Sequence, residues 1–267
     1  MAFASLDFYS EVLQQESHLR VLIPERRDGL GYRPLTNEEG KHPVLVLLHG
    51  LGDGASAWTR YTAVERYARR YGLAVVMPEV GRSFYSDLKH GEAYWTYVSR
   101  ELLQKCYEFF PQISQKREDH YAAGLSMGGY GALKLALQAP GDFCFAGALS
   151  AAPDIVARAE TQFRDDPLFR SNLGSPEELR GSVSDLFDAA EKLAESGKKL
   201  PQIMMWCGTE DFLYQDNARF YEHLQKLGYP VEFRESTGDH QWKYWDQEIQ
   251  TVLDRICADR GVSYVIW

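Results

Sequence analysis

The chain has 267 residues, of which 45% are hydrophobic and 13% aromatic, enough to build a substantial buried core. Its 38 acidic residues outnumber its 29 basic residues, and the net charge of −9 argues against nucleic acid or an anionic membrane as the partner. No stretch approaches the roughly 18 consecutive apolar residues of a membrane-spanning helix.

The cysteines and the first residues of the chain predict where in the cell the protein is located. The cysteines form no C-x-x-C pair and lie on apolar segments, at Cys106, Cys144, Cys207 and Cys257. Such cysteines are typical of buried free thiols in a reducing environment. The opening residues contain no basic segment followed by an apolar run, so no signal peptide is predicted. The sequence therefore predicts a cytoplasmic protein.

Extended segments recur along the whole chain. Strands are predicted at residues 6–13, 19–25, 43–50, 73–80, 120–126, 145–152, 202–211 and 231–236. The first two resemble an antiparallel hairpin at a sheet edge, and a charged, glycine-rich loop follows at residues 26–42. Continuous apolar runs such as Val44–Leu48 are typical of strands buried on both faces.

Helical segments alternate with these strands. Apolar residues spaced three and four apart predict helices at residues 58–72, 93–110, 127–139, 216–228 and 241–258, with one or two more in 175–199. This alternation predicts an α/β protein whose central sheet is mostly parallel, with helices on both faces. No repeat, linker or long cap insertion interrupts it, so residues 1–267 are expected to form a single domain.

The corner between residues 120–126 and 127–139 carries the sequence Gly124-Leu-Ser126-Met127-Gly128. The residues around it match neither phosphate-binding pattern: the Lys-Ser/Thr of a P-loop is absent, and so is the Gly-x-Gly-x-x-Gly of a dinucleotide-binding loop. They match the nucleophile elbow Gly-x-Ser-x-Gly, which places a serine on a sharp turn from strand to helix. The serine backbone is expected to be strained there, and the flanking glycines avoid collisions.

Polar residues that follow apolar strands are the candidates for chemistry, since they gather at the carboxyl edge of the sheet. Ser126, His49, Asp211 and His240 meet this condition. The order Ser126, Asp211, His240 is that of an α/β-hydrolase triad. A neutral imidazole can accept the serine proton, and a carboxylate fixes the imidazole tautomer.

Other residues are candidates for the acid and for the histidine of the triad. Glu210 is the neighbouring rival of Asp211 for the acid, and Asp246 is a weaker one. His49 closes a strand before a glycine and is interpreted as structural. No spacing of histidine, cysteine or carboxylate residues suggests a metal site, and no cofactor is predicted.

The developing oxyanion of an acyl transfer needs backbone donors. The N–H of Met127, at the start of a helix, is one candidate. The loop after residues 43–50 should supply the other from Leu51, with Gly50 as the second choice and as a substrate contact. Several aromatic residues lie in or beside these loops, and Tyr85 and Trp242 are predicted to contact the substrate.

With these residues in view, the chain resembles the esterase family of α/β-hydrolases that holds esterase D, S-formylglutathione hydrolase and the tributyrin esterases. The likeness is strongest to the bacterial tributyrin esterases and covers nearly the whole chain. The motifs that carry it are VLVLLHGLGDGASAW, VVMPEVGRSFYSD, AGLSMGGYGALKLAL, WCGTEDFLY and TGDHQWKYWDQEI.

The resemblance implies a serine carboxylesterase acting on short acyl esters, with Ser126, Asp211 and His240 as the triad and Leu51 and Met127 at the oxyanion hole. It also implies similarity to acetyl and feruloyl esterases of decorated sugars. The expected partner is a small-molecule ester. Three alternatives stay open: a thioesterase of the S-formylglutathione hydrolase type, an acyltransferase and a non-catalytic binding module. Residues 261–267 match no part of the family pattern and are candidates for an extra strand or a homo-oligomer contact.

Overall fold

The computed structural model of the chain describes residues 1–25 and 36–258. Its strands form one eight-stranded sheet in the order β1-β2-β4-β3-β5-β6-β7-β8. Their bounds are β1 (Ala2–Ser10), β2 (Gln15–Ile23), β3 (Val44–Leu48), β4 (Ala74–Pro78), β5 (His120–Leu125), β6 (Phe145–Leu149), β7 (Gln202–Gly208) and β8 (Val231–Ser236).

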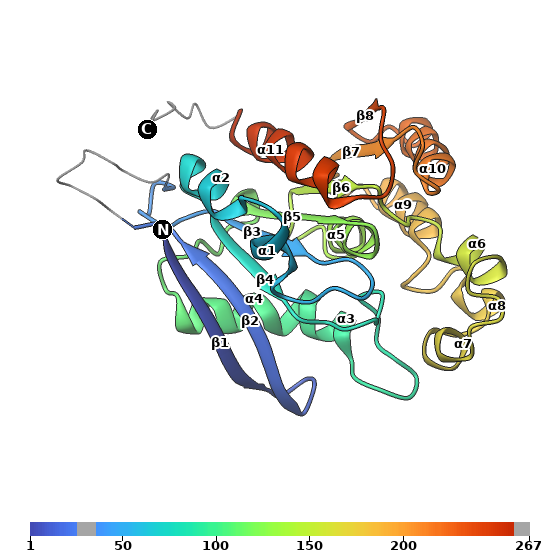
Figure 1. Cartoon of the computed structure of the whole chain (residues 1–267), viewed down its shortest axis with the longest axis horizontal. Helices are drawn as coiled ribbons and strands as arrows, with labels where there is room; N and C mark the ends of the chain where they lie inside the picture. The colour runs from blue at the N-terminus through green and yellow to red at the C-terminus, as the bar shows by residue number, and fades with distance from the viewer. Residues whose placement is uncertain (26–35, 259–267) are drawn as a thin grey trace.

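The pairing of the strands confirms the predicted sheet. β1 and β2 form an antiparallel hairpin, and β2 is antiparallel to β4. All the other neighbours, from β4 through β8, are parallel. The hairpin lies at one end of the sheet, and β7 and β8 lie at the other beside α10 (Tyr214–Lys226) (Figure 1).

Helices cover both faces of the sheet, as predicted. Their bounds are α1 (Ala57–Tyr61), α2 (Val64–Tyr71), α3 (Tyr94–Thr96), the π-helical turn η2 (Tyr97–Glu101), α4 (Leu102–Phe109), the 3₁₀ turn η3 (Arg117–Asp119), α5 (Met127–Gln138), α6 (Ile155–Glu160), α7 (Pro167–Leu173), α8 (Pro176–Leu179), α9 (Leu186–Glu195), α10 (Tyr214–Lys226) and α11 (Trp242–Ala258).

The core has two halves, one on each face. In β3, Val46 and Leu48 point into the half that contains residues of α4, α5, α9 and α10. Leu45 and Leu47 point into the half that contains residues of α1, α2 and α11. This alternation explains why β3 is apolar at every position: side chains on both faces of the strand are buried.

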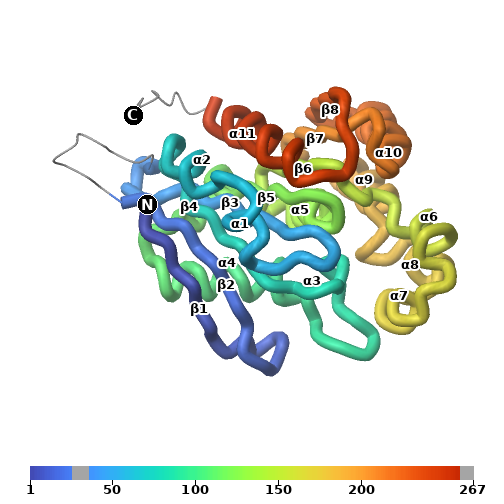
Figure 2. Tube along the Cα trace, viewed as in Figure 1, coloured from blue at the N-terminus to red at the C-terminus, as the bar shows by residue number. Residues whose placement is uncertain are grey.

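Two stretches differ from the predicted helices. The helix expected at residues 58–72 is divided into α1 and α2, because the hydroxyl of Thr62 accepts the N–H of Val64 at 3.1 Å and Asp246 accepts the N–H of Ala63 at 3.0 Å. Between β6 and β7, α6 and α7 are present in addition to the helices expected at residues 175–199. Together with α8 they form a group beside the sheet, here called the roof helices (Figures 1 and 2). They form no separate cap domain.

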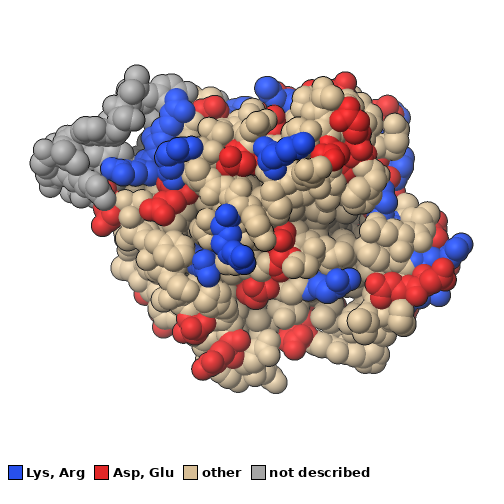
Figure 3. All heavy atoms as spheres, in the orientation of Figure 1, with Lys and Arg blue, Asp and Glu red and all other residues tan. Residues whose placement is uncertain are grey.

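Some predictions concern residues outside the described part of the chain. The loop predicted at residues 26–42 falls partly outside it, and the segment 261–267 falls wholly outside it. None of the described helices is long and apolar enough to cross a membrane. On the face shown in Figure 3, acidic and basic side chains are interspersed among broad uncharged areas.

A buried lysine joins α5 to two surface segments. Lys134 has 0% exposure, and its ammonium group donates to the carbonyl of Tyr85 at 3.0 Å, to Ser86 Oγ at 2.9 Å and to Ser184 Oγ at 3.1 Å. The ring of Trp95 lies 4.9 Å from the same nitrogen. Burial lowers the pKa of Lys134 to about 7, and the nearby charge of Asp87 opposes that shift only partly.

Replacing Lys134 by Met should reveal this shift as a pH-dependent stability difference. An unfolded lysine has a pKa near 10.4, so above about pH 7 the unfolded chain holds a proton that the folded chain lacks. The free energy of unfolding of the wild type, relative to Lys134→Met, should therefore rise by about 1–2 kcal/mol between pH 7 and pH 8.5. Urea denaturation of both proteins at both pH values measures it.

The exposed Lys198, replaced by Met, is the matched control and should show no such pH dependence. A gap between wild type and Lys134→Met that stays constant from pH 7 to pH 8.5 would mean that the folded-state pKa of Lys134 is close to its ordinary value.

Candidate active site

Ser126 occupies the corner where β5 runs directly into α5. Its backbone has φ 54° and ψ −117°, in the left-handed half of conformational space. Its N–H donates to the carbonyl of Leu149 in β6, and its carbonyl accepts the N–H of Tyr130 in the first turn of α5. The strained conformation predicted for this serine is confirmed, and such strain persists only where the surroundings enforce it.

The elbow glycines provide the clearance that was predicted. A Cβ on Gly124 would lie 2.4 Å from the carbonyl oxygen of Gly128. A Cβ on Gly128 would lie 2.3 Å from the carbonyl oxygen of Leu48 and 2.7 Å from that of His49. Because these neighbours are backbone atoms, no side-chain rotation could relieve the collision. The glycines therefore let α5 approach the end of β3.

Asp211 and His240 lie together after the ends of β7 and β8. His240 Nδ1 donates to Asp211 Oδ2 at 2.8 Å. Burial acts to raise the pKa of Asp211, but the hydrogen bond and charge of His240, the N–H of Leu213 and the hydroxyl of Ser150 outweigh it and lower the pKa. Asp211 is therefore ionised at neutral pH, and it fixes the imidazole with its proton on Nδ1.

Two side chains that the sequence analysis did not select support this pair. The indole N–H of Trp245 donates to Ser150 Oγ at 3.1 Å, and the Trp245 ring meets the His240 ring edge-on at 4.8 Å. Ser150 follows the apolar strand β6, so the rule that selected Ser126 and Asp211 could also have selected it. Trp245 gave no comparable signal, because aromatic residues in helices usually belong to the core.

Ser126 Oγ makes no hydrogen bond within the described part of the chain, so it is not bonded to His240 in this conformation. Hydrogen bonds between a nucleophile and its base are often long without substrate and shorten when substrate binds. Gly50, in contrast, lies close to Ser126. A Cβ on Gly50 would lie 3.8 Å from Ser126 Cβ, which places the loop after β3 directly beside the serine.

The loop after β3 is held by buried hydrogen bonds. His49 Nδ1 donates to the carbonyl of Gly50 at 2.9 Å, and its Nε2 accepts the N–H of Val80 at 3.2 Å. The indole N–H of Trp58 donates to the carbonyl of Leu48. These contacts agree with a structural role for His49. They hold Leu51, whose backbone N–H donates to no acceptor among the described residues.

Met127 is the first residue of α5, and its N–H likewise has no acceptor within the described part of the chain. The first N–H groups of a helix lack partners within the helix, and the helix dipole favours negative charge there. The predicted donors Leu51 and Met127 are thus both unengaged: Leu51 lies on the loop beside Ser126, and Met127 directly follows Ser126 at the start of α5.

The predicted substrate contact of Tyr85 is not supported. Tyr85 is fully buried, and its hydroxyl donates to the carbonyl of His49 at 2.9 Å. Gly131 lies against the Tyr85 ring, which leaves no surface for a ligand. The sequence placed this tyrosine near the site correctly, but its function there is to hold the loop after β3.

The other two predicted substrate contacts stay predictions. Trp242 is partly exposed and meets the ring of Trp58 at 5.1 Å and that of Trp245 at 5.5 Å. Gly50 is next to Ser126, as described above. Of the rivals for the acid, Glu210 is exposed, and Asp246 accepts hydrogen bonds from the N–H of Ala63 and the hydroxyl of Tyr67.

A pocket of about 180 Å³ opens beside the loop after β3. Its wall is mainly aromatic and aliphatic, with three polar side chains, and consists of Leu51, Arg82, Phe84, Phe163, Asp166, Leu168, Phe169, Asn172 and Leu173. Phe163 and Phe169 are stacked at 4.4 Å, and Phe84 meets each of them edge-on. Helix α7 and the residues just before it thus build one wall of a pocket next to Leu51.

A larger pocket of about 500 Å³ is lined by residues such as Tyr121, Phe145 and Gln202. These residues lie at the amino ends of β5, β6 and β7, at the opposite edge of the sheet from Ser126. Among the described residues, no group of three or more histidine, cysteine or carboxylate side chains could hold a metal ion.

Comparison with known proteins identifies the family of this chain. The model of the family described as "Putative esterase" matches residues 10–256. The chain belongs to this esterase family. An acetyl esterase from Caldicellulosiruptor saccharolyticus is 31% identical over 262 residues, which cover 95% of this chain and 97% of that protein.

Two solved structures from Staphylococcus aureus are similar to this member of the esterase family. A fluorophosphonate-binding serine hydrolase has a TM-score of 0.85 and 32% identity, and covers 96% of this chain and 98% of its own. An S-formylglutathione hydrolase has a TM-score of 0.83 with the same identity and coverage. The α/β-hydrolase fold without a separate cap domain is therefore confirmed.

Replacing Gly128 by Ala should damage both the fold and the site, because the added Cβ would lie 2.3 Å from backbone. We expect a loss of about 2 kcal/mol or more in the free energy of unfolding, as is typical of overpacking. Thermal unfolding measures it. Gly141 is the matched control: a Cβ there meets nothing within 4 Å, so Gly141→Ala should unfold within a degree or two of the wild type. Equal stability of the two variants would contradict the close approach of α5 and β3.

Proposed function

We propose that this protein is a serine carboxylesterase that hydrolyses short-chain acyl esters through an acyl intermediate on Ser126. The observation that carries the proposal is the left-handed backbone of Ser126 at the corner between β5 and α5. That conformation is costly and presents a hydroxyl at the carboxyl edge of the sheet, where Asp211 and His240 are already paired.

Each residue has a defined role in acylation. His240 Nε2 takes the proton of Ser126 as Oγ attacks the ester carbonyl, since Asp211 keeps the ring proton on Nδ1. The N–H groups of Leu51 and Met127 donate to the oxyanion of the tetrahedral intermediate. His240 then passes its proton to the leaving alcohol, and the acyl group stays on Ser126.

Deacylation repeats the same steps with water. His240 removes a proton from water as it attacks the acyl carbonyl, and then returns that proton to Ser126 Oγ. The carboxylic acid leaves and the serine is restored. An alcohol in place of water would give acyl transfer, so the transferase alternative needs the same residues and differs only in the acceptor.

A thioesterase is the second candidate, supported by the S-formylglutathione hydrolase of similar sequence and structure. The pocket beside Leu51 favours an ester with a larger acyl group, because about 180 Å³ far exceeds the needs of a formyl group. Buried thiols such as those of Cys106 and Cys207 support a reducing compartment and therefore a cytoplasmic location.

A fluorophosphonate probe tests the proposal, because it reacts only with an activated serine. Ser126→Ala should abolish labelling and lower ester hydrolysis by roughly 10⁴-fold or more, while thermal unfolding stays close to that of the wild type. Ser196→Ala, at an exposed serine, is the control and should label fully. Retention of more than about a hundredth of the activity in Ser126→Ala would exclude Ser126 as the nucleophile.

Acyl-chain length gives a further expected result. An apolar cavity of about 150 Å³ holds a benzene molecule, so a pocket of similar size accepts acyl groups of only a few carbons. Beyond that, additional methylenes stay in water and contribute none of the roughly 0.8 kcal/mol that burial of each one brings. The value of kcat/KM on nitrophenyl esters should peak between acetate and butyrate and fall about tenfold or more by octanoate. A steady rise toward palmitate would contradict the assignment.

A further inference from the structure

The strand order separates the two sides of Ser126. The sheet runs β4-β3-β5-β6-β7-β8, so Ser126 at the end of β5 has β3 and β4 on one side and β7 and β8 on the other. The aromatic pocket contains Leu51, which follows β3, and Phe84, which follows β4. His240 and its neighbours follow β7 and β8. The pocket and the histidine therefore flank the serine from opposite sides.

This separation, taken with the proposed esterase mechanism, assigns the two halves of an ester. The leaving alcohol receives its proton from His240, so its oxygen must lie against Nε2. The acyl group then points toward β3 and β4, into the pocket beside the oxyanion donors. The protein group that contacts the rest of the alcohol therefore lies near His240.

Phe212 is the candidate. It follows Asp211 directly, its ring centroid lies 4.7 Å from that of His240, and it is 57% exposed. The other ring against His240, that of Trp245, is buried. Single exposed aromatic residues are common on protein surfaces. Phe212 differs because its ring lies against the imidazole and is nevertheless more than half exposed.

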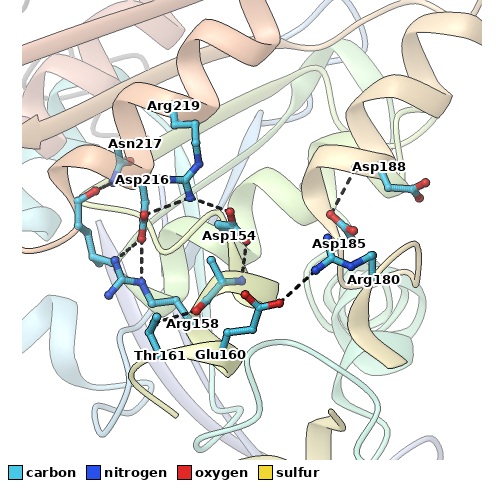
Figure 4. Close-up of polar contacts among 12 residues, drawn as sticks. Asp154, Arg158, Glu160, Thr161, Arg180, Asp185, Asp188, Asp216, Asn217 and Arg219 are labelled. Atoms are coloured by element: carbon cyan, nitrogen blue, oxygen red, sulfur yellow. Dashed lines mark hydrogen bonds and ion pairs between the residues drawn. The ribbon is translucent and has the colours of Figure 1, made fainter. Parts of the chain in front are cut away.

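Phe212 is also held in place. The Arg158 guanidinium carbon lies 5.8 Å from the centre of its ring. Arg158 is fixed by Asp216, which accepts from Arg158 Nε at 2.7 Å and also from Nη2. Asp216 accepts a further bond from Arg219, which in turn donates to Asp154 (Figure 4). This ion-pair network joins α6 to α10 and fixes the Arg158 side chain that lies against Phe212, so the ring is held in place without substrate.

We infer that Phe212 is a specificity-determining residue, an aromatic platform that binds the leaving alcohol when that alcohol carries a ring beside the ester oxygen. An aromatic face stacks on the flat apolar face of another ring, either an aryl ring or a pyranose. A ring-free alcohol or a linear thiol has no such face to offer. The inference rests on the proposed function and adds the chemistry of the alcohol to it.

The test keeps the acyl group constant and varies the alcohol. Wild type, Phe212→Ala and Phe212→Tyr are assayed on ethyl acetate, phenyl acetate and an acetylated methyl xylopyranoside. Comparing each variant with the wild type on the same ester cancels the intrinsic reactivity of the leaving group. Phe212→Ala should lower kcat/KM about threefold to tenfold more on the ring-bearing esters than on ethyl acetate, and Phe212→Tyr should restore it. The phenyl and xyloside arms distinguish an aryl from a sugar platform.

The rate of deacylation distinguishes alcohol binding by Phe212 from a role in which Phe212 only holds His240 in position. Once the alcohol has left, the acetyl-enzyme is the same for every substrate. Phe212→Ala should therefore leave the deacylation rate and its pH profile unchanged. A variant that only disturbed His240 would slow deacylation and would lower kcat/KM on ethyl acetate at least as much as on the ring-bearing esters, and that result would overturn the inference.

Leu168→Ala is the matched variant on the other side of the serine. Leu168 is 69% exposed and lines the aromatic pocket, so its loss should change the ratio of butyrate to acetate hydrolysis without changing the preference for ring-bearing alcohols.

Failure of the proposed function would give a different result: the wild type would hydrolyse none of the esters and would not label with fluorophosphonate. Uniform effects of Phe212→Ala on an active, labelled wild type would reject the platform alone.

Discussion

The close approach of α5 to the end of β3 is the constraint on which the site depends. Since β5 passes into α5 without a loop, Ser126 must take a left-handed backbone, and Gly124 and Gly128 must lack side chains. The same geometry places the Ser126 hydroxyl and the Met127 N–H at one corner. The proposed nucleophile and one proposed oxyanion donor therefore lie at a single strained corner that the packed sheet maintains.

The remaining groups are brought to this corner by buried polar contacts from distant segments. Tyr85 and His49 fix the loop that carries Leu51, while Ser150 and Trp245 support the pair of Asp211 and His240. Buried polar networks of this kind specify one arrangement, because an unmatched donor or acceptor is costly.

The sheet and the segment that contains the roof helices contribute different residues to the proposed site. The groups of the proposed chemistry follow β3, β5, β7 and β8. The segment between β6 and β7 contributes Phe163 and Phe169 to the aromatic pocket and Arg158 to the contact with Phe212. Connecting segments tolerate change better than a buried sheet, so we expect substitutions in this segment to alter substrate preference more readily than substitutions in the strands.

The sequence by itself determined the alternation of strands and helices, the elbow at Ser126 and the chain order of Ser126, Asp211 and His240. These features are local, since they depend on periodicity, on glycine spacing and on polar residues that follow apolar strands. Only the tertiary structure decided that Tyr85 is buried beneath the loop after β3, that Ser150 and Trp245 support the histidine, and that Phe212 stands open beside it. Whether an aromatic ring near a site is core or surface depends on which distant segments pack against it, and the pattern along one chain carries no record of those contacts.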